Sequence, residues 1–426
     1  MTSTLIQNVR LLCPASGTDK IADVRLDAGR ISHIGSAPAA DETINAQGHW
    51  LMPGVIDLAA RLREPGATAK ATIASEAKAA FAAGIATLVM PPDTKPVADT
   101  PAVVDRIHAK AAQAGGAAVR VLGALTVGLQ GEALGELSAL KAAGVVGVTN
   151  GLRPLANLLL ARRALEYAHG LGLTVHVVAV DAALANGGCA HEGAMATKLG
   201  LSPIPVAAEV AAIRQWISLV EDTGAAVHFG RLSSARGAEL IESAQARKLP
   251  VTADVAAHQL FLTDAALEGF NALAHVLPPL RSADDRDALR GALAKGVIGS
   301  ICSDHQPHEP DAKVNPFPLT EPGISGLETL LPLGLRLVEA GVLSPLQCAA
   351  RLSTGPAAVL NLSPPRISVG ESVSLVLVDP SVSWTLTAST LQSRGQNTPF
   401  AGQWFTGRAV RTFIREQVLP PPHRIV

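Results

Sequence analysis

The chain is poor in aromatic residues, which make up 3% of its 426 residues. Proteins that bind single-stranded nucleic acid stack bases on aromatic side chains, so this shortage argues against such a surface. An excess of one charge is also lacking, because 35 Lys and Arg nearly balance 36 Asp and Glu, leaving a net charge of −1. This balance gives no basic footprint for nucleic acid or an anionic membrane. We therefore expect a small molecule or another protein as the partner.

Cysteines and long apolar runs are scarce as well. The longest apolar run, around 79–90, contains a glycine and ends at two prolines, well short of the roughly 18 residues of a membrane span. The first residues show no basic region leading into an apolar stretch. We expect a cytoplasmic protein with free thiols and no membrane segment. The four cysteines lie far apart without a Cys-x-x-Cys pair: Cys13, Cys189, Cys302 and Cys348.

What the chain does contain is a repeated pattern of a short β-branched run, a Gly, Pro or Asp turn, and a helical stretch of about 12–18 residues. Helix starts and ends carry cap signals, as in Thr100-Pro101 before 102–114 and Ser282 before 286–295. Eight such strands predict an α/β fold, a closed (β/α)8 TIM barrel. The strand candidates are 55–58, 85–90, 119–125, 145–149, 174–179, 226–230, 251–255 and 297–302.

The two ends of the chain show a different pattern. Apolar and polar residues alternate in 4–50 and again in 373–378 and 404–414, which is typical of strands. Two β-rich ends that flank a barrel pair most economically with each other, so we predict one small β-sandwich domain. The tail Pro420-Pro421-Pro422-His423 is expected to be an extended arm. The predicted division is a composite β-sandwich of 1–52 with 366–426, and a barrel of 53–365.

The first predicted barrel strand leads into a polar loop, 57–66. In many hydrolases such a strand ends in His-x-His, whose alternate residues point the same way and share a zinc ion. Here the two positions are Ala59 and Arg61. A methyl group has no lone pair, and a guanidinium offers donors but no acceptor. Neither side chain can bind a metal.

Five motifs follow one another along most of the chain: Leu62-Arg63-Glu64-Pro65-Gly66, Pro278-Pro279-Leu280-Arg281, Ser303-Asp304-His305-Gln306-Pro307-His308, Gly323-Ile324-Ser325-Gly326-Leu327-Glu328 and Ser393-Arg394-Gly395-Gln396-Asn397-Thr398-Pro399-Phe400. In this order they resemble the dihydroorotase family of the amidohydrolase superfamily. The resemblance implies a metal centre at the carboxyl-terminal mouth of the barrel. There a metal-bound hydroxide would attack a cyclic amide, and the aspartate after strand 8 would move the proton.

The metal ligands that the resemblance implies are mostly replaced in this chain. Of six positions only Asp304 matches, whereas a catalytic zinc needs about three protein ligands and an open position. Two replacements are arginines, which would repel a dication by on the order of several kcal/mol. We therefore expect no zinc and no catalytic role for a vestigial Asp304. The five replaced positions are Ala59, Arg61, Asn150, Val178 and Arg231.

The substrate positions that the resemblance implies are altered less uniformly. Arg63 matches the residue that grips the substrate carboxylate, and His308 matches a further substrate position. Asp93 stands where an asparagine is expected and would repel that carboxylate. Leu277 replaces a second asparagine and loses its hydrogen bond. We expect all four positions to be vestigial.

Asp304 needs a partner if its carboxylate is buried, because an isolated buried charge is costly. We predict that Arg61 or Arg231 reaches into the vacated metal position and forms an ion pair with Asp304. The alternative is that Asp304 survives as a general base.

Several other residues have two open interpretations. Arg63 can hold a ligand or can serve the architecture of its Pro-Gly turn. Cys189 follows two glycines but has no paired histidine in its sequence context, so we expect an ordinary thiol. Five histidines near predicted strand ends can form an unorthodox metal site or can be ordinary histidines bonded to the backbone: His176, His228, His258, His305 and His308.

The leading hypothesis is a catalytically inactive dihydroorotase-like pseudoenzyme rather than an enzyme. In some bacteria a non-catalytic homologue of this family assembles with aspartate carbamoyltransferase in pyrimidine biosynthesis. The resemblance implies that partner here, together with self-association of this chain. A second hypothesis is an active dihydroorotase or other cyclic-amide hydrolase with a reduced metal site at Asp304, His305 and His308. A third is a metal-free protein in which Arg63 holds a small carboxylate.

Overall fold

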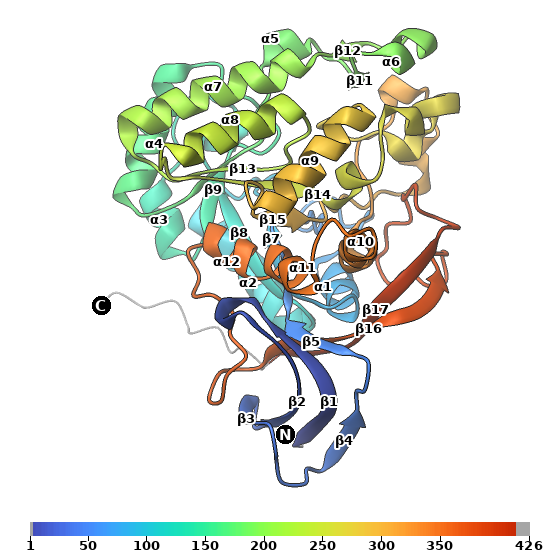
Figure 1. The fold of residues 1–426 in the computed structure, drawn as a ribbon. Helices are drawn as coiled ribbons and strands as arrows, with labels where there is room; N and C mark the ends of the chain where they lie inside the picture. The colour runs from blue at the N-terminus through green and yellow to red at the C-terminus, as the bar shows by residue number, and fades with distance from the viewer. Residues whose placement is uncertain (1–2, 415–426) are drawn as a thin grey trace.

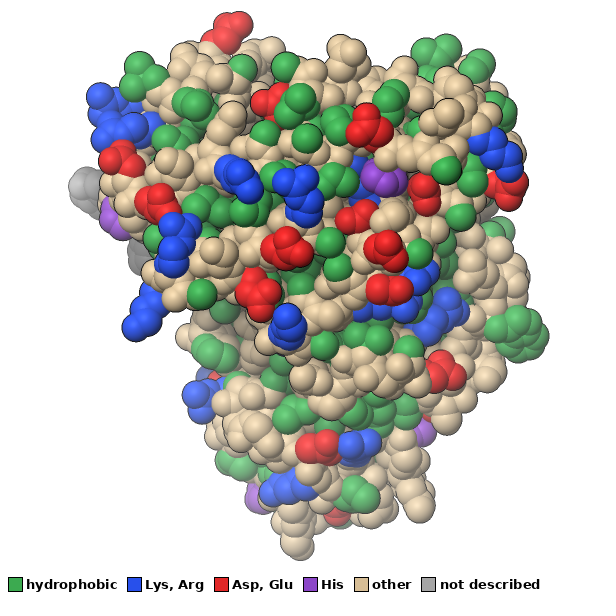
Figure 2. All heavy atoms as spheres, turned by 45° about the horizontal axis from the view of Figure 1, so that its top comes forward, with side chains coloured by type: hydrophobic (Ala, Val, Ile, Leu, Met, Phe, Trp, Pro, Cys, Tyr) green, Lys and Arg blue, Asp and Glu red, His purple; other side chains and the backbone are tan. Residues whose placement is uncertain are grey.

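The computed structural model describes residues 3–414, so the predicted arm at 420–423 lies outside the described residues. Figure 1 shows a barrel surrounded by helices, with a sheet built from both ends of the chain packed below it. Within 3–414, no helix combines the length and the apolar character needed to cross a membrane. Figure 2 shows acidic and basic side chains interspersed on the face turned toward the viewer, in keeping with the balanced composition.

The barrel contains eight parallel strands that follow one another in sequence order, which confirms the predicted fold. Their Val, Ile, Leu and Ala side chains are mostly buried, as expected for a parallel sheet covered on both faces. Several strands are shorter than predicted, because residues at their ends leave the ladder for the connecting loops. The strands are β6 (Val55–Asp57), β7 (Ile85–Met90), β8 (Ala118–Ala124), β9 (Gly147–Thr149), β10 (Val175–Val177), β13 (Val227–Phe229), β14 (Val251–Ala256) and β15 (Ser300–Cys302).

The barrel closes between β6 and β15 through contacts just beyond these two strands. The Ser303 backbone N–H donates to Asp57 Oδ1 at 2.9 Å, and the Ser303 hydroxyl donates to the other carboxylate oxygen. The His305 N–H donates to the Ala59 carbonyl at 3.0 Å, and the Arg61 N–H donates to the His305 carbonyl at 2.9 Å. The loops that carry Arg61 and Asp304 are therefore tied together by backbone bonds.

Helices cover the barrel, and their starts follow the predicted cap chemistry. The Ser282 hydroxyl accepts from the Asp285 N–H at the start of α9. Thr72 forms a capping box with Ser75 at the start of α1. The α-helices are α1 (Ile73–Ala82), α2 (Pro101–Ala114), α3 (Leu137–Ala142), α4 (Leu158–Gly170), α5 (Ala182–Ala185), α6 (Ala194–Leu199), α7 (Val206–Thr223), α8 (Ala235–Ala246), α9 (Ala283–Lys295), α10 (Leu327–Glu339), α11 (Pro345–Leu352) and α12 (Thr354–Val359).

Shorter elements lie between these helices. The 3-10 helices are η1 (Pro14–Ser16), η2 (Val127–Leu129), η3 (Ala257–Leu260), η4 (Asp264–Phe270), η5 (Ala272–Ala274), η6 (Pro310–Lys313) and η7 (Phe317–Leu319). Two short strands, β11 (Ala190–His191) and β12 (Pro203–Ile204), pair in parallel. Of these elements, η6 and η7 follow the loop that carries Asp304.

The two ends of the chain pair with each other, as predicted. β16 lies antiparallel to β5, with Leu377 opposite Leu51. The strands form one continuous seven-stranded sheet in the order β17-β16-β5-β1-β2-β3, with β4 on β1. They are β1 (Thr4–Cys13), β2 (Thr18–Asp27), β3 (Arg30–Ile34), β4 (Glu42–Asn45), β5 (Trp50–Pro53), β16 (Ser374–Thr385) and β17 (Trp404–Ile414).

Alternate residues of this sheet serve two cores. Leu51 and Leu377 pack within the core of the end sheet, whereas Met52 and Val378 face the barrel core, as the two-residue period of a strand requires. Gly54 joins β5 to β6, and a Cβ at this position would lie 2.4 Å from that of Ala86. The end sheet is therefore seated directly on the barrel, and the mouth with its loops lies at the opposite ends of the barrel strands.

Candidate functional site

The centre of the mouth holds an ion pair between an arginine and an aspartate. Arg231 Nη1 lies 2.7 Å from Asp304 Oδ1, and Arg61 Nη1 lies 3.6 Å from the same oxygen. All three residues are buried, with exposed fractions of 9%, 1% and 5% for Arg231, Asp304 and Arg61. The predicted ion pair is confirmed, with Arg231 as the closer partner.

Local backbone conformation directs these side chains to one point. Asp304 and Arg231 both have positive φ, at 44° and 58°, a conformation that costs on the order of 1–3 kcal/mol for a non-glycine residue. The Arg231 N–H donates to Asp254 Oδ1 at 2.6 Å, which anchors its turn. Gln306 Nε2 donates to the second oxygen of Asp304 at 3.2 Å. Both oxygens of Asp304 are thus engaged by side chains of the protein.

Asp93 extends the network on the side of β7. Arg61 Nε donates to Asp93 Oδ2 at 2.6 Å. Partial desolvation acts to raise the pKa of Asp93, but Arg61 and the nearby Arg63 and Arg231 outweigh it and hold that pKa below its usual value. The mouth therefore contains the series Asp93, Arg61, Asp304 and Arg231, in which opposite charges alternate.

Arg63 bonds to its own chain. Its Nε donates to the Pro307 carbonyl at 3.0 Å, and its Nη2 lies 3.0 Å from His308 Nε2. Lys70 Nζ lies 3.0 Å from His308 Nδ1. Burial and the charges of Arg63, Lys70 and Lys313 lower the pKa of His308 to about 3, so this imidazole is neutral at pH 7. These contacts favour the architectural interpretation of Arg63.

Asn150, one of the replaced positions, uses both ends of its side-chain amide within the protein. Its Oδ1 accepts the Thr126 hydroxyl at 2.6 Å, and its Nδ2 donates to the Arg153 carbonyl at 3.0 Å. A cavity of 30 Å³ lies nearby, enough for one or two water molecules by order of magnitude. Its lining includes Ala59, Val178, His176, His228 and Arg231.

His228 forms a buried pair that the sequence did not reveal. Its Nε2 lies 2.9 Å from Asp254 Oδ2, and its Nδ1 lies 2.9 Å from the Thr252 hydroxyl. Burial acts to raise the pKa of Asp254, but the bonds from His228 and the Arg231 N–H lower it overall. The only signal for this pair in the sequence was Asp254, two residues after Thr252 in a predicted strand. The contact itself could not be predicted, because His228 lies on the neighbouring strand.

His305 forms a second such pair, away from the mouth. Its Nδ1 accepts the Gly326 N–H at 3.1 Å, which leaves Nε2–H to donate to Glu76 Oε2 at 2.9 Å. The Ser393 hydroxyl donates to the same Glu76 oxygen at 2.6 Å. Both ring nitrogens of His305 are therefore used by the scaffold, and α1 contributes a functional partner, Glu76, that sequence reasoning missed.

Of the other site residues, His258 and His176 lie close enough to Arg231 to feel its charge, whereas Leu277 lies elsewhere. His258 is buried, and burial together with Arg231 lowers its pKa to about 4, against the opposing charge of Asp304. Burial, the neighbouring His228 and Arg231 lower the pKa of His176 to about 3, although Asp254 opposes the shift. Leu277 lines a different cleft, together with Pro278 and Pro279.

The donors at the mouth do not fit a catalytic zinc. Asp304, the one matching ligand, is held by guanidinium groups, and Ala59 and Val178 present only carbon. Among residues 3–414, no cluster of three or more His, Cys, Asp or Glu side chains has a geometry that would hold a metal ion. Such a centre needs about three protein ligands, so no chemical step through a metal follows from this arrangement.

Comparison with known proteins gives a consistent set of relatives. The family model described as Dihydro-orotase-like matches residues 48–236. A dihydroorotase-like protein of Pseudomonas aeruginosa is 50% identical over 96% of this chain and 97% of its own length, and one of Pseudomonas putida is 48% identical over 98% and 99%. A dihydroorotase of Syntrophotalea carbinolica is 42% identical over 96% and 97%.

Solved structures share the fold. The L-hydantoinase of Arthrobacter aurescens superposes with a TM-score of 0.87 at 24% identity, covering 98% of this chain and 96% of the hydantoinase. The dihydropyrimidinase of Brevibacillus agri gives a TM-score of 0.85 at 22% identity, covering 97% and 94%. At this identity the likeness concerns the architecture of the barrel and the end sheet.

Proposed function

This chain belongs to the dihydroorotase family, and we propose that it is a member without hydrolytic activity that acts as a structural partner of aspartate carbamoyltransferase in pyrimidine biosynthesis. The proposal places it in the cytoplasm, as a self-associating chain without bound zinc. One observation carries the loss of catalysis, namely the ion pair between Arg231 and Asp304.

The ion pair supports this proposal in two ways: its arginine repels a metal dication, and little open volume remains beside it. A guanidinium occupies the coordination side of Asp304, the one aspartate that would serve both metal and proton transfer. A dication brought beside Arg61 and Arg231 would meet two permanent positive charges. The cavity at this point measures 30 Å³, which is far below the roughly 300 Å³ of the smaller ligand pockets.

The partnership is supported by the contrast between the mouth and the scaffold. The barrel strands, the helix caps and the end sheet are all in place, and the chain aligns with a relative over 97% of the length of that relative. A protein that retains this frame while its metal ligands are replaced is suited to assembly. Aspartate carbamoyltransferase is the partner that the family resemblance implies.

Metal content and turnover test the loss of catalysis. The protein is purified without chelator, its zinc is counted by mass spectrometry, and dihydroorotate hydrolysis is followed with added zinc, beside an active dihydroorotase treated identically. We expect substoichiometric zinc and no turnover. One zinc per chain with turnover would instead establish a hydrolase with a reduced metal site.

Assembly is tested separately, by native mass spectrometry of a mixture with the aspartate carbamoyltransferase of the same organism. We expect a complex of defined stoichiometry. A chain that ignores this subunit at micromolar concentration would refute the partnership, while leaving the conclusion on catalysis in place.

A further inference from the structure

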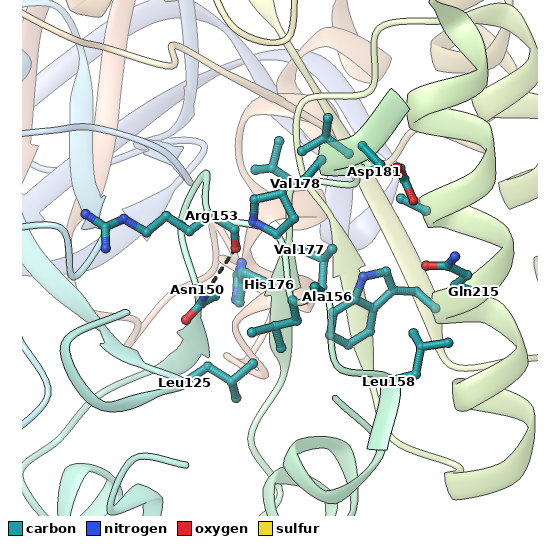
Figure 3. A pocket seen from close by; sticks show the side chains of 18 residues that line it. Leu125, Asn150, Arg153, Ala156, Leu158, His176, Val177, Val178, Asp181 and Gln215 are labelled. Carbon is teal, nitrogen blue, oxygen red and sulfur yellow. Dashed lines mark hydrogen bonds between the residues drawn. The ribbon is translucent and has the colours of Figure 1, made fainter. Parts of the chain in front are cut away.

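A second hollow lies beside the mouth and takes no part in the arginine network. This cleft measures 290 Å³ and lies between the loop before α4, the end of β10 and the helix α7 (Figure 3). It shares Gly151, His176, Val177 and Val178 with the small cavity at the vacated metal position. The cleft therefore leads from the helical layer to the wall of the mouth.

The walls of the cleft are mainly apolar. Leu125, Val178 and the half-buried Trp216 line it, so a bound molecule would exchange water for carbon and an indole ring. Its volume lies just below the range of about 300–1,000 Å³ for ligand pockets. A molecule with a single ring fits this space.

Two charged side chains line the cleft, and one of them is fixed. Asp181 is half-buried, and its Oδ1 accepts the Leu184 N–H at 2.9 Å as the cap of α5. Arg153 is exposed, and Figure 3 shows its guanidinium extending away from Asp181 and Gln215, which lie on the same side of the cleft. Of the two charges, the one held in place by a hydrogen bond is therefore negative.

His176, which also lines the cleft, carries no positive charge that would repel a bound cation. His176 is 7% exposed, and its Nε2 has no hydrogen-bond partner within the described part of the chain. Its pKa of about 3 keeps the ring neutral at pH 7, so the ring offers one N–H and one lone pair.

We propose that this cleft binds a small arylalkylammonium, a primary amine on a short chain with one aromatic ring. The ring packs against Trp216 and the aliphatic wall. The ammonium lies between the Asp181 carboxylate and the face of the indole, where both attract a cation. An alkylamine with a pKa near that of lysine, about 10.4, is protonated at neutral pH. This site does not depend on whether the mouth hydrolyses a substrate.

Three matched probes test the sign of the charge that the cleft prefers. Isothermal titration of the full chain compares 2-phenylethylamine, 2-phenylethanol and 3-phenylpropionate. We expect the amine to bind most tightly, then the alcohol, then the carboxylate. No binding of any probe, equal binding of all three, or tighter binding of the carboxylate would overturn the proposal.

Two matched variants locate the contact. Asp181→Asn keeps the cap of α5, because Asn caps helices as well as Asp does, yet it removes the charge. We expect amine affinity to fall about fivefold, the upper end for a charge pair at a partly exposed site, with alcohol affinity unchanged. Arg153→Gln should leave amine affinity unchanged or slightly increased. Unchanged amine binding in Asp181→Asn, with circular dichroism showing a native fold, would contradict the assignment.

Discussion

Two carboxylates at the same end of the barrel are equally buried but have opposite kinds of partner. Asp57, on β6, is 0% exposed and accepts bonds from the neutral backbone and hydroxyl of Ser303. Asp304, one residue beyond Ser303, is 1% exposed and is held by the cations Arg231 and Arg61. Neutral donors are sufficient to close the barrel. At the mouth, cationic side chains hold the carboxylate.

The largest effect is expected from removing the cation at the mouth. Arg231→Met leaves Asp304 buried with the more distant Arg61 as its nearest cation, and breaking a buried pair from one side costs about 3–5 kcal/mol. Urea unfolding followed by circular dichroism measures this loss. The double variant Arg231→Met with Asp304→Leu should recover most of the stability, and a double variant as unstable as Arg231→Met would contradict the ion-pair account.

A pH-dependent effect is expected at the barrel seam, by which we mean the contact between Asp57 and Ser303 that joins β6 to the loop after β15. Burial raises the pKa of Asp57 to about 6 from its ordinary 3.8, although its bonds from Ser303 oppose the shift. The folded state then keeps a proton that the unfolded state has lost between pH 4 and 6, so this contribution to stability is present below pH 4 and lost as pH rises through 6. The loss amounts to about 3 kcal/mol.

Asp57→Asn removes this titration while keeping an oxygen that accepts the Ser303 N–H. The difference in unfolding free energy between wild type and variant should therefore change between pH 4 and 7, moving in favour of the variant. A difference that stays constant across this range would show that the seam carboxylate does not titrate there.

A smaller effect is expected when the seam loses one neutral donor. Ser303→Ala removes the hydroxyl bond to Asp57 and keeps the N–H bond, which should cost about 1–3 kcal/mol for a buried acceptor that loses a partner. Thermal unfolding of the variant checks this value. A loss as large as that of Arg231→Met would remove the distinction between seam and mouth.

The smallest effect is expected at the surface, where the same kind of ion pair is exposed. Arg10 Nε lies 2.8 Å from Asp19 Oδ1, with side chains 40% and 33% exposed. Solvent screening limits such pairs to about 0–1 kcal/mol, so Asp19→Asn should barely change the urea midpoint. A cost near that of Arg231→Met would mean that burial is not what makes the mouth pair strong.

Much of the fold could be predicted because its signals are local. The eight strands, the cap at Ser282 and the pairing of the two chain ends follow from β-branched runs, cap residues and alternation. The pair between Arg231 and Asp304 could be predicted as well, because a buried carboxylate that loses its metal needs another cation.

The remaining contacts could not be predicted, since they join residues far apart in the chain without a paired pattern. Glu76 meets His305 across 229 positions, and Asp57 meets Ser303 across 246. His228 and Asp254 share adjacent strands, where register decides the contact. The cleft beside Trp216 depends on how a loop lies over α7, which no local pattern specifies.

The central claim concerns which cation neutralises Asp304. Crystals of the protein soaked in zinc, with anomalous data collected at the zinc absorption edge, test it at the atom in question. The account predicts the Arg231 guanidinium on Asp304 and no anomalous peak at the mouth. A zinc peak bonded to Asp304, with Arg231 displaced, would contradict it.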